Sequence, residues 1–504
     1  MTDAGHRASR LNAARRARDL ERVAEETVDV LVVGLGVTGA GAALDAASRG
    51  LSVAAIDAHD LAFGTSRWSS KMVHGGLRYL ARGQVGVAYE SAVERGILLT
   101  RTAPHLARAQ PYLLPLVPSV SPGQAALAMT GYRLGDALRA AARTPRRVLP
   151  GPSRLPASRA LEAAPAVRRR GLRGALLSWD GRLVDDARLV VALARTAAWC
   201  GARVLTRCRA LRLAPGGAEV RDELTGSALT IRARAVVNAT GVWAGRLADV
   251  RLRPSRGSHL VLRPGVLPLR AGLHVPIPGT VNRFALVLPQ PDGRVYVGLT
   301  DEPVDGPVPD VPEVPEEDVT ALLEVVNGVL EAPLTRADVA GAFAGLRPLL
   351  EAPGRTADLS RRHAVLDTGG VVTVVGGKLT TYRRMAEDAV DRALALRGVP
   401  AGPSVTASLP LVGAGGTAVA AGVPRRLVER YGSEAREVWE LARRFPEEAG
   451  LGVTLGELVW AVRCEGALDV DDLLDRRTRL GLVPADRAAA LPLAHAALEA
   501  ALPH

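Results

Sequence analysis

The sequence predicts an α/β protein with a doubly wound domain that is assembled from separated stretches of the chain. Residues 28–57 read as a buried strand, a glycine-rich turn, a helix and a second strand in immediate succession. The next strand that fits the same sheet, within residues 233–241, follows only after a long interruption. Short alternating segments between residues 252 and 301 predict an antiparallel sheet in a second domain.

The other predicted elements follow from local patterns of apolar residues, glycine and proline. In chain order they are a basic, weakly amphipathic helix at 8–27, a helix at 86–107, a region punctuated by proline and glycine up to about 171, a helix at 185–202, a strand, tight turn and helix at 369–394, and a mostly helical remainder from about 420. The basic helix at 8–27 could lie on anionic lipid or pack on the protein, and the sequence leaves both open.

Composition limits the class of protein. With 504 residues the chain is expected to hold two or three domains. Its formal charge of +12 would suit an anionic partner, but the arginines are spread along the chain and no motif that reads DNA or RNA is present. We therefore expect no nucleic-acid partner.

The cysteines and the N-terminus indicate the compartment. Cys200, Cys208 and Cys464 give neither metal-ligand spacing nor a disulfide framework, so a reduced cytoplasm and no metal site are expected. No apolar signal-peptide region is seen near the start, and the uncharged run Val30–Leu44 is too short and glycine-rich to span a bilayer. Any membrane contact is expected to be peripheral.

The motif Gly34-Leu35-Gly36-Val37-Thr38-Gly39 indicates a dinucleotide site. Its glycines allow a tight turn, a close approach of the backbone to a pyrophosphate, and close packing of helix on strand. Asp57 ends the second strand, where an acceptor for ribose hydroxyls belongs. Because the strand ending at Asn238-Ala239-Thr240-Gly241 comes so late, the arrangement is typical of two-domain flavoproteins, with Ala239 and Gly241 where the backbone can approach the dinucleotide.

Lysine is almost absent from the chain. Only Lys71 and Lys378 occur among 64 basic residues, and both stand in glycine-flanked motifs. A compact ammonium suits a single oxygen acceptor, whereas the planar guanidinium needs a wider site. We therefore interpret both lysines as functional residues.

These motifs occur in an order that resembles the FAD-dependent glycerol-3-phosphate dehydrogenases. The resemblance is carried by DVLVVGLGVTGAGAALDAASRGL, GTSRWSSKMVHGGLRYL, APHL, WDGRLVDDARLV, NATGVWA, GSHLVL, GLTDE, AGLRPL, GGKLTTYR and RRTRLGL. It implies a discontinuous Rossmann-like FAD-binding domain, a substrate domain with an antiparallel sheet, and a C-terminal helical cap. The segments expected are the N-terminal helix at 1–27, the core at 28–398 (FAD domain about 28–95, 172–249 and 335–398; substrate domain about 96–171 and 250–334), and the cap at 399–504.

The resemblance also implies site residues. Those expected at FAD, besides the glycines and Asp57, are Thr65, Ser66, Ser70, Lys71, Ala239, Gly241, Gly377, Leu379 and Thr380. Those expected at the substrate phosphate are Arg78, Tyr79, Arg361 and Lys378. His259 is expected as the base that takes the hydroxyl proton, with His74 as the alternative, and Arg347 as the group that stabilises the developing alkoxide.

The implied reaction is oxidation of sn-glycerol 3-phosphate to dihydroxyacetone phosphate by hydride transfer to FAD. Electrons would pass to a respiratory quinone, in a cytoplasmic protein held peripherally at the inner membrane surface. Oxygen is the alternative acceptor, and the oligomeric state stays open, with a homodimer as one expectation. A flavin oxidase acting on an amino or hydroxy acid, and a non-enzymatic nucleotide-binding protein, are the rival interpretations.

Overall fold

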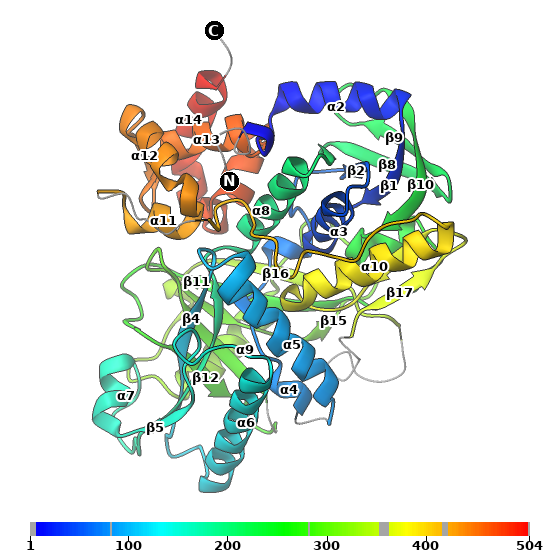
Figure 1. The fold of residues 1–504 in the computed structure, drawn as a ribbon. Coiled ribbons are helices and arrows are strands. Elements are labelled where there is room, and N and C mark those ends of the chain that lie inside the picture. The colour runs from blue at the N-terminus through cyan, green and yellow to red at the C-terminus, as the bar shows by residue number, and fades with distance from the viewer. Residues whose placement is uncertain (1–6, 81–82, 281–282, 352–361, 416–421, 502–504) are drawn as a thin grey trace.

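The computed structural model describes residues 7–80, 83–280, 283–351, 362–415 and 422–501, and for Leu77 and Arg78 it describes the backbone alone. Two large sheets and a group of C-terminal helices make up this part of the chain (Figure 1). The α/β fold with a helical C-terminal region is thereby confirmed. Within the described residues, no helix is both long and apolar enough to cross a membrane.

The first sheet is the doubly wound one. Its parallel strands run in the order β18, β10, β1, β2 and β7, with β17 antiparallel at one edge and the hairpin β8–β9 beside β10. Their bounds are β1 (Thr27–Val33), β2 (Val53–Ile56), β7 (Arg203–Leu205), β8 (Cys208–Ala214), β9 (Gly217–Asp222), β10 (Ala228–Asn238), β17 (Ala364–Asp367) and β18 (Val372–Val375). The central strands β1, β2 and β18 are largely buried and rich in valine and alanine, as expected for a sheet covered on both faces.

Helices cover both faces of this sheet. On one face α3 (Val37–Ser48) packs between α8 (Asp186–Trp199) and α10 (Tyr382–Arg397). The glycines and alanines of α3 are almost all buried, because short side chains let the helices approach one another. On the other face α2 (Ala13–Glu25) packs on β7 and β10.

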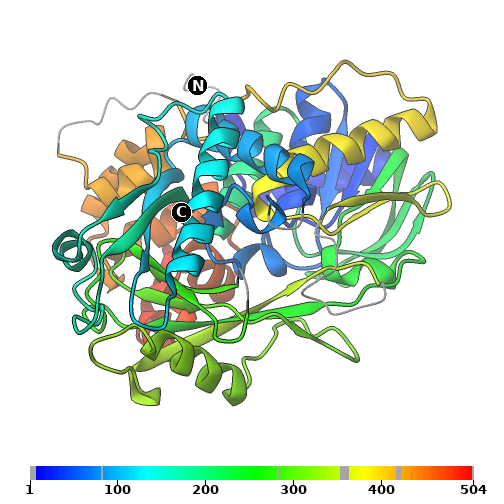
Figure 2. The same cartoon turned by 90° about the horizontal axis from the view of Figure 1, so that it is seen from below.

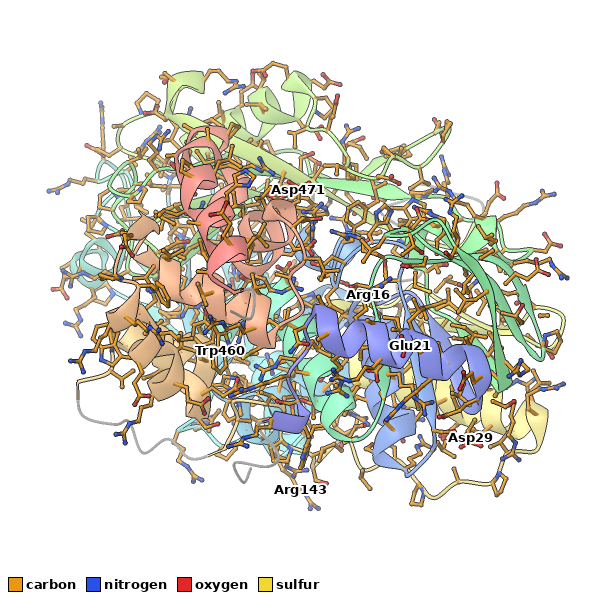
Figure 3. The ribbon with its side chains drawn as sticks, turned by 90° about the horizontal axis from the view of Figure 1, so that it is seen from above. Arg16, Glu21, Asp29, Arg143, Trp460 and Asp471 are labelled. Carbon is orange, nitrogen blue, oxygen red and sulfur yellow. The ribbon has the colours of Figure 1, made fainter. Side chains whose placement is uncertain are left out.

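The basic N-terminal helix therefore packs on the protein. Arg16 of α2 is buried and donates hydrogen bonds to the carbonyl of Thr206, at 2.7 Å, and to Asp222. Figure 3 shows α2 from above, with Arg16 and Glu21 labelled, beside the C-terminal helices that carry Trp460. At least one arginine of this segment is thus paired inside the fold, in line with the packed alternative.

The second sheet is larger and mixed. Its strand order is β15, β11, β14, β13, β12, β4, β6 and β3, with β16 paired to β11 and β5 paired to β6. The bounds are β3 (Met72–Val73), β4 (Ala107–Pro115), β5 (Ser153–Leu155), β6 (Ala175–Leu183), β11 (Ser255–Leu262), β12 (Gly272–Pro276), β13 (Phe284–Pro289), β14 (Val295–Gly298), β15 (Glu302–Pro303) and β16 (Val339–Arg347). The antiparallel strands predicted between residues 252 and 301 form its centre.

Three strands lie elsewhere than the predicted segments imply. β3, β6 and β16 were expected in the FAD domain, but all three pair with strands of the second sheet. The reason is long-range pairing: β16 is held along its whole length by β11, far away in the sequence. The division of the chain into segments otherwise stays a prediction.

Helices flank the second sheet as well. α9 (Glu316–Asn327) packs its apolar side on β11, β12, β13 and β14. The long helix α6 (Pro122–Ala141) crosses the sheet region on another side, as the cyan helix in Figure 2 shows. α5 (Val85–Ile97) contacts α6, and so does the short α4 (Leu77–Leu80).

The C-terminal region consists of α11 (Arg425–Tyr431), α12 (Ala435–Arg444), α13 (Leu455–Cys464) and α14 (Pro484–Ala500), with cores of its own. Buried ion pairs join it to the doubly wound domain. Arg195 of α8 pairs with Glu434 at 2.7 Å, and Asp60 accepts hydrogen bonds from Arg476 and Arg477 at 2.8 to 2.9 Å. These contacts fix the helices against the loop that follows β2.

Candidate active site

A cavity of about 670 Å³ lies at the carboxyl ends of the parallel strands and continues over the second sheet. The register aligns Val33 of β1 with Asn238 of β10 and Ile56 of β2, so these strands end at one edge. The carboxyl edge of a doubly wound sheet is where such folds bind dinucleotides. The cavity wall holds residues from every motif quoted above except APHL and the C-terminal RRTRLGL.

The glycine motif forms the start of α3. Gly34 has φ of 99°, and a Cβ there would lie 2.6 Å from the carbonyl oxygen of Ala239. A Cβ on Gly39 would lie 1.7 Å from the carbonyl oxygen of Gly34, so this glycine serves packing and does not line the cavity. Gly36 caps α3 and lines the cavity, where a Cβ would press on the Ser66 hydroxyl at 3.1 Å. No side chain separates the helix start from a bound anion.

Asp57 lies on the cavity wall directly after β2. Its carboxylate accepts hydrogen bonds from the backbone N–H of Leu35, at 2.6 Å, and of His59, at 2.8 Å. Burial raises the pKa of Asp57 to about 6, against the effect of these two donors. Asp57 is therefore placed and charged at neutral pH as an acceptor for hydroxyl groups.

An aromatic wall that the sequence analysis missed borders the same end. His59 and Phe63 stack at 3.8 Å between ring centroids, and Trp243 lies next to Phe63 at 6.3 Å. All three line the cavity. Aromatic residues are few in this chain. Nothing in the sequence spacing of these three residues indicated that they would lie together.

The segment after β2 forms the next part of the wall. Thr65 donates its hydroxyl to the carbonyl of Leu346 at 2.7 Å, and Ser66 accepts the Val37 N–H at 2.8 Å. Ser70 faces the second sheet, where its hydroxyl lies 2.9 Å from Nε2 of His259. Thr65, Ser66 and Ser70 all line the cavity, and so do Ala239 and Gly241.

Lys71 does not line the cavity, contrary to the expected contact with the cofactor. The side chain is 1% exposed, and its ammonium lies 2.9 Å from Asp186 and donates to the carbonyl of Arg67 at 2.5 Å. Asp186 also accepts from the N–H and the hydroxyl of Ser69. Lys71 thus fixes the turn that presents Ser69 and Ser70, in a backbone conformation with φ of 55°.

His259 is buried at the floor of the cavity. Its ring stacks on Phe343 at 4.7 Å, and Gly298 leaves room for it, since a Cβ there would lie 2.3 Å from the ring. Burial, with the charges of Lys71 and Arg347 nearby, lowers the pKa of His259 to about 3. The imidazole is therefore neutral at pH 7 and able to accept a proton.

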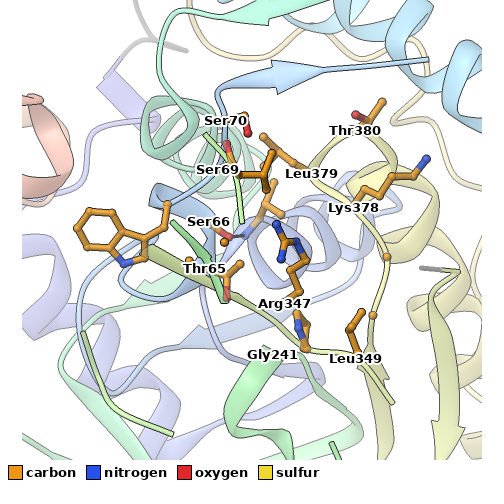
Figure 4. A pocket seen from close by; sticks show the side chains of 18 of the residues that line it. Thr65, Ser66, Ser69, Ser70, Gly241, Arg347, Leu349, Lys378, Leu379 and Thr380 are labelled. Carbon is orange, nitrogen blue, oxygen red and sulfur yellow. Dashed lines mark hydrogen bonds between the residues drawn. The ribbon is translucent and has the colours of Figure 1, made fainter. Parts of the chain in front are cut away.

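Arg347 ends β16 and reaches into the cavity, between Ser66 and Leu349 in Figure 4. Its guanidinium donates to Asp301 at 3.2 Å, to the Ser255 hydroxyl at 3.1 Å and to the carbonyl of Thr300 at 3.2 Å. Gly257 makes space for it, because a Cβ there would lie 2.4 Å from a guanidinium nitrogen. Asp301 therefore helps to hold this guanidinium in place.

The Gly75-Gly76 turn brings His74 and Tyr79 to the cavity wall. The His74 N–H donates to the Thr380 hydroxyl at 3.1 Å. The Lys378 ammonium lies over the Tyr79 ring at 4.2 Å and donates to the Ser91 hydroxyl, and in Figure 4 it points away from Arg347. The side chain of Arg78 and all of Arg361 lie outside the described residues.

The segment Gly376–Thr380 closes the site from the side of β18. Gly377 has φ of 74° and leads through Lys378 into a 3₁₀ turn, Leu379–Thr381, at the start of α10. Gly377, Leu379 and Thr380 line the cavity, as expected. Backbone N–H groups at this helix start favour an anionic neighbour.

The residues present fit FAD. The cavity joins a side-chain-free helix start, a carboxylate at the end of β2 and an aromatic wall to a polar chamber over the second sheet. The first three would hold the dinucleotide, and the chamber with Ser66, Ser70 and the Gly377–Thr380 turn would hold its flavin.

Comparisons with known proteins agree with this geometry. Residues 29–383 match the family described as FAD dependent oxidoreductase, and residues 404–502 match the C-terminal domain of alpha-glycerophosphate oxidase. The chain is 53% identical over 495 residues to glycerol-3-phosphate dehydrogenase 1 of Mycobacterium tuberculosis, covering 95% of this chain and 96% of that protein. The mitochondrial glycerol-3-phosphate dehydrogenase of Rattus norvegicus is 33% identical over 508 residues, with 90% of this chain and 68% of that protein covered.

Solved structures give the same picture. The glycerol-3-phosphate dehydrogenase from Bacillus halodurans, complexed with FAD, aligns with a TM-score of 0.74 and 27% identity over 97% of this chain and 94% of that one. The L-alpha-glycerophosphate oxidase from Mycoplasma pneumoniae shares the fold, with a TM-score of 0.57 and 19% identity over 77% of this chain and 99% of that one. The chain belongs to the FAD-dependent oxidoreductases and, within them, to the glycerol-3-phosphate dehydrogenase family.

Proposed function

We propose that this chain oxidises sn-glycerol 3-phosphate at C2 to dihydroxyacetone phosphate. The observation that carries the proposal is the placement of a neutral histidine and a fixed guanidinium on one cavity, beside a site that fits FAD. The 53% identity to a glycerol-3-phosphate dehydrogenase supports the choice of substrate. When bound, FAD supplies the acceptor for the two electrons and the hydrogen that leave C2.

His259 is the proposed base. Its ring is buried, but the Ser70 hydroxyl on its Nε2 lines the cavity, so a proton from the C2 hydroxyl reaches the imidazole through Ser70. The neutral state of the ring at pH 7 makes it an acceptor. His74, on the same cavity, remains the alternative base.

Arg347 is the proposed electrophile. Negative charge develops on the C2 oxygen as its proton leaves, and a guanidinium already fixed by Asp301 and Ser255 stabilises this charge without reorganising. Tyr79 and Lys378, with Arg78 and Arg361 by resemblance, are proposed for the phosphate. An arginine suits this role because its guanidinium matches two phosphate oxygens.

The electron acceptor is proposed to be a quinone of the cytoplasmic membrane, at whose surface the protein would sit peripherally. The apolar part of the cavity supports this proposal, because it reaches Leu127 and Leu134 of α6, each 51% exposed. The role would be in glycerol and glycerophospholipid catabolism. Oxygen is the competing acceptor.

Anaerobic rapid mixing tests the substrate and the residues together. Glycerol 3-phosphate should bleach the flavin absorption, whereas glycerol at the same concentration should not. Arg347→Gln should slow the bleaching about 100- to 1,000-fold, the usual loss for one donor to a developing oxyanion. Arg159→Gln, at an exposed arginine that pairs with the exposed Glu162, is the matched control.

Absence of bleaching by glycerol 3-phosphate in FAD-loaded protein would refute the substrate. A wild-type bleaching rate in Arg347→Gln would refute the role of the guanidinium. Ser70→Ala separates the two bases, since it should slow the reaction only if the proton passes to His259.

A further inference from the structure

The cavity has a second polar end, remote from His259. His274 of β12 lies on its wall, with Nδ1 at 2.9 Å from the hydroxyl of Tyr132 on α6. The His274 ring stacks on Tyr112 at 5.1 Å with 3° between the planes, and Phe284 lies 5.8 Å away. None of the reaction steps proposed above uses this group.

Strand register measures how far this end is from the base. His259 of β11 pairs with Gly298 of β14, Gly298 with Leu286 of β13, and Leu286 with His274 of β12. Directly paired residues project from the same face, so the two histidines stand in one row three strands apart. At about 4.8 Å per strand spacing, they are about 14 Å apart.

The substrate is shorter than the separation of the two histidines. The chain of glycerol 3-phosphate from the C1 hydroxyl to a phosphate oxygen has six bonds, and at about 1.5 Å per bond it cannot exceed about 9 Å. With its C2 oxygen at Arg347 and its phosphate at Tyr79 and Lys378, as proposed above, the substrate gives the His274–Tyr132 pair no role in flavin reduction.

The lining indicates the chemistry of that molecule. Around His274 and Tyr132 the wall is mostly apolar, with the polar residues Thr130 and Arg283 among the lining. The apolar side chains are those of Leu127, Ala128, Leu134, Ile277, Phe284 and Leu286. Leu127 and Leu134 are half exposed, so this end opens to the outside along α6. A flat apolar ring with a carbonyl oxygen matches a mostly apolar chamber that has aromatic rings and the His274–Tyr132 pair on its wall.

We propose that His274 and Tyr132 hold the ring of the quinone acceptor, which enters along α6 between Leu127 and Leu134. With Tyr132 donating to Nδ1, the neutral ring carries its hydrogen on Nε2 and donates it to a quinone carbonyl. Burial lowers the pKa of His274 to about 4, which agrees with a neutral ring. The site rests on the proposed function, since it completes the same turnover.

The exchange balances without another reactant. The substrate loses the C2 hydrogen with two electrons and the hydroxyl hydrogen as a proton. The quinone gains two electrons and two protons, and its two carbonyl groups become the hydroxyls of a quinol. Because the quinone would have its own end of the cavity, the reduced flavin could be reoxidised before dihydroxyacetone phosphate leaves.

Separate measurement of the two half-reactions tests the site. In Tyr132→Phe and His274→Leu, glycerol 3-phosphate should bleach the flavin absorption anaerobically at the wild-type rate. Reoxidation of the reduced proteins by a soluble 1,4-naphthoquinone should be about tenfold slower and need more quinone for half the maximal rate, as expected for a lost hydrogen bond in a buried site. Reoxidation by ferricyanide, a small outer-sphere oxidant, should not change.

The rim has its own variants. Leu127→Gln should weaken a long-chain quinone more than a short one, and Leu224→Gln, at a similarly exposed leucine outside the cavity, is the control. Wild-type reoxidation by naphthoquinone in Tyr132→Phe and His274→Leu would overturn the proposal. The proposal would also be overturned if these two variants were bleached more slowly by the substrate but reoxidised normally by the quinone. The chamber would then bind the substrate. If glycerol 3-phosphate does not bleach even the wild type, the proposed function fails, and photoreduced protein still tests the quinone site.

Discussion

The two lysines of this arginine-rich chain have different surroundings. Lys378 lies on the cavity wall beside Tyr79, whereas Lys71 is enclosed behind it by Asp186 and the carbonyl of Arg67. A guanidinium has no room where a 1% exposed ammonium fills the space, so lysine is required at position 71 by packing. The functional interpretation of Lys71 thus changes from cofactor contact to support of the Ser69–Ser70 turn.

Removing the Lys71 charge should destabilise the protein. In Lys71→Met the Asp186 carboxylate stays buried without its cation, and the loss should be about 3–5 kcal/mol in the free energy of unfolding. Arg159→Met, at an exposed ion pair, should lose less than about 1 kcal/mol. Denaturant unfolding of the two variants compares these values, and equal midpoints would show that the buried pair contributes nothing.

The pH dependence of flavin reduction identifies the base. Because burial and nearby cations lower the pKa of His259 to about 3, the imidazole stays unprotonated from about pH 5 to pH 8. With saturating FAD and substrate, the rate of anaerobic bleaching should then be flat across this range. A rate that falls with acid around an apparent pKa between 6 and 7 would assign the proton to a different group.

At the scale of elements, the turn after β2 is held by the C-terminal region. Asp60, three residues beyond Asp57, accepts hydrogen bonds from Arg476 and Arg477, and Arg476 lies 5.7 Å from the Phe63 ring. Although burial opposes it, these two arginines hold the pKa of Asp60 well below its ordinary range. The C-terminal helices therefore position the carboxylate and the aromatic wall at one end of the FAD site.

Weakening this contact should release FAD. Asp60→Asn should raise the dissociation constant of FAD about tenfold, because the turn that carries Asp57 loses charge-assisted hydrogen bonds. Glu434→Gln is the matched control, since it weakens another buried ion pair of the same region, with Arg195, away from the cavity. Fluorescence titration of the two apoprotein variants with FAD measures their dissociation constants. If Asp60→Asn and Glu434→Gln bind FAD equally well, the C-terminal region only stabilises the fold.

At the scale of the whole molecule, buried histidines decide the response to acid. Burial lowers the pKa of His105 and His259 to about 3 and of His59 and His274 to about 4, while it raises the pKa of Asp57 and Asp472 to about 6. At pH 5 the four histidines are protonated in the unfolded chain but not in the native chain. The two carboxyl groups are protonated in the native chain but not in the unfolded chain. For these six groups, unfolding therefore takes up two net protons.

Stability of the apoprotein should fall as the pH is lowered from 6 to 5. A net uptake of two protons on unfolding corresponds to about 2.7 kcal/mol per pH unit, with greater stability at the higher pH. Denaturant midpoints at pH 5 and pH 6 measure the change. An unchanged or higher midpoint at pH 5 would contradict the assignment of neutral buried histidines.

The sequence by itself determined the parts of this protein that are local. The Gly34–Gly39 turn, the strands around it, Asp57 at the end of β2, and the glycines that precede Leu379 each follow from a few consecutive residues whose backbone conformation allows little choice. Motif order then led to the family, which the comparisons confirmed. Side chains within these motifs, such as Ser66 and Thr380, lie on the cavity wall for the same reason.

Only the tertiary structure decided where side chains point and which strands pair. Lys71 stands between cavity residues in sequence, but its partner Asp186 is 115 positions away, and this pairing turns the lysine from the cavity. β6 and β16 join the second sheet through register with distant strands. His259 and His274 share a row because four separate strands align, and no spacing in the sequence encodes such an alignment, since side-chain packing over the whole sheet sets it.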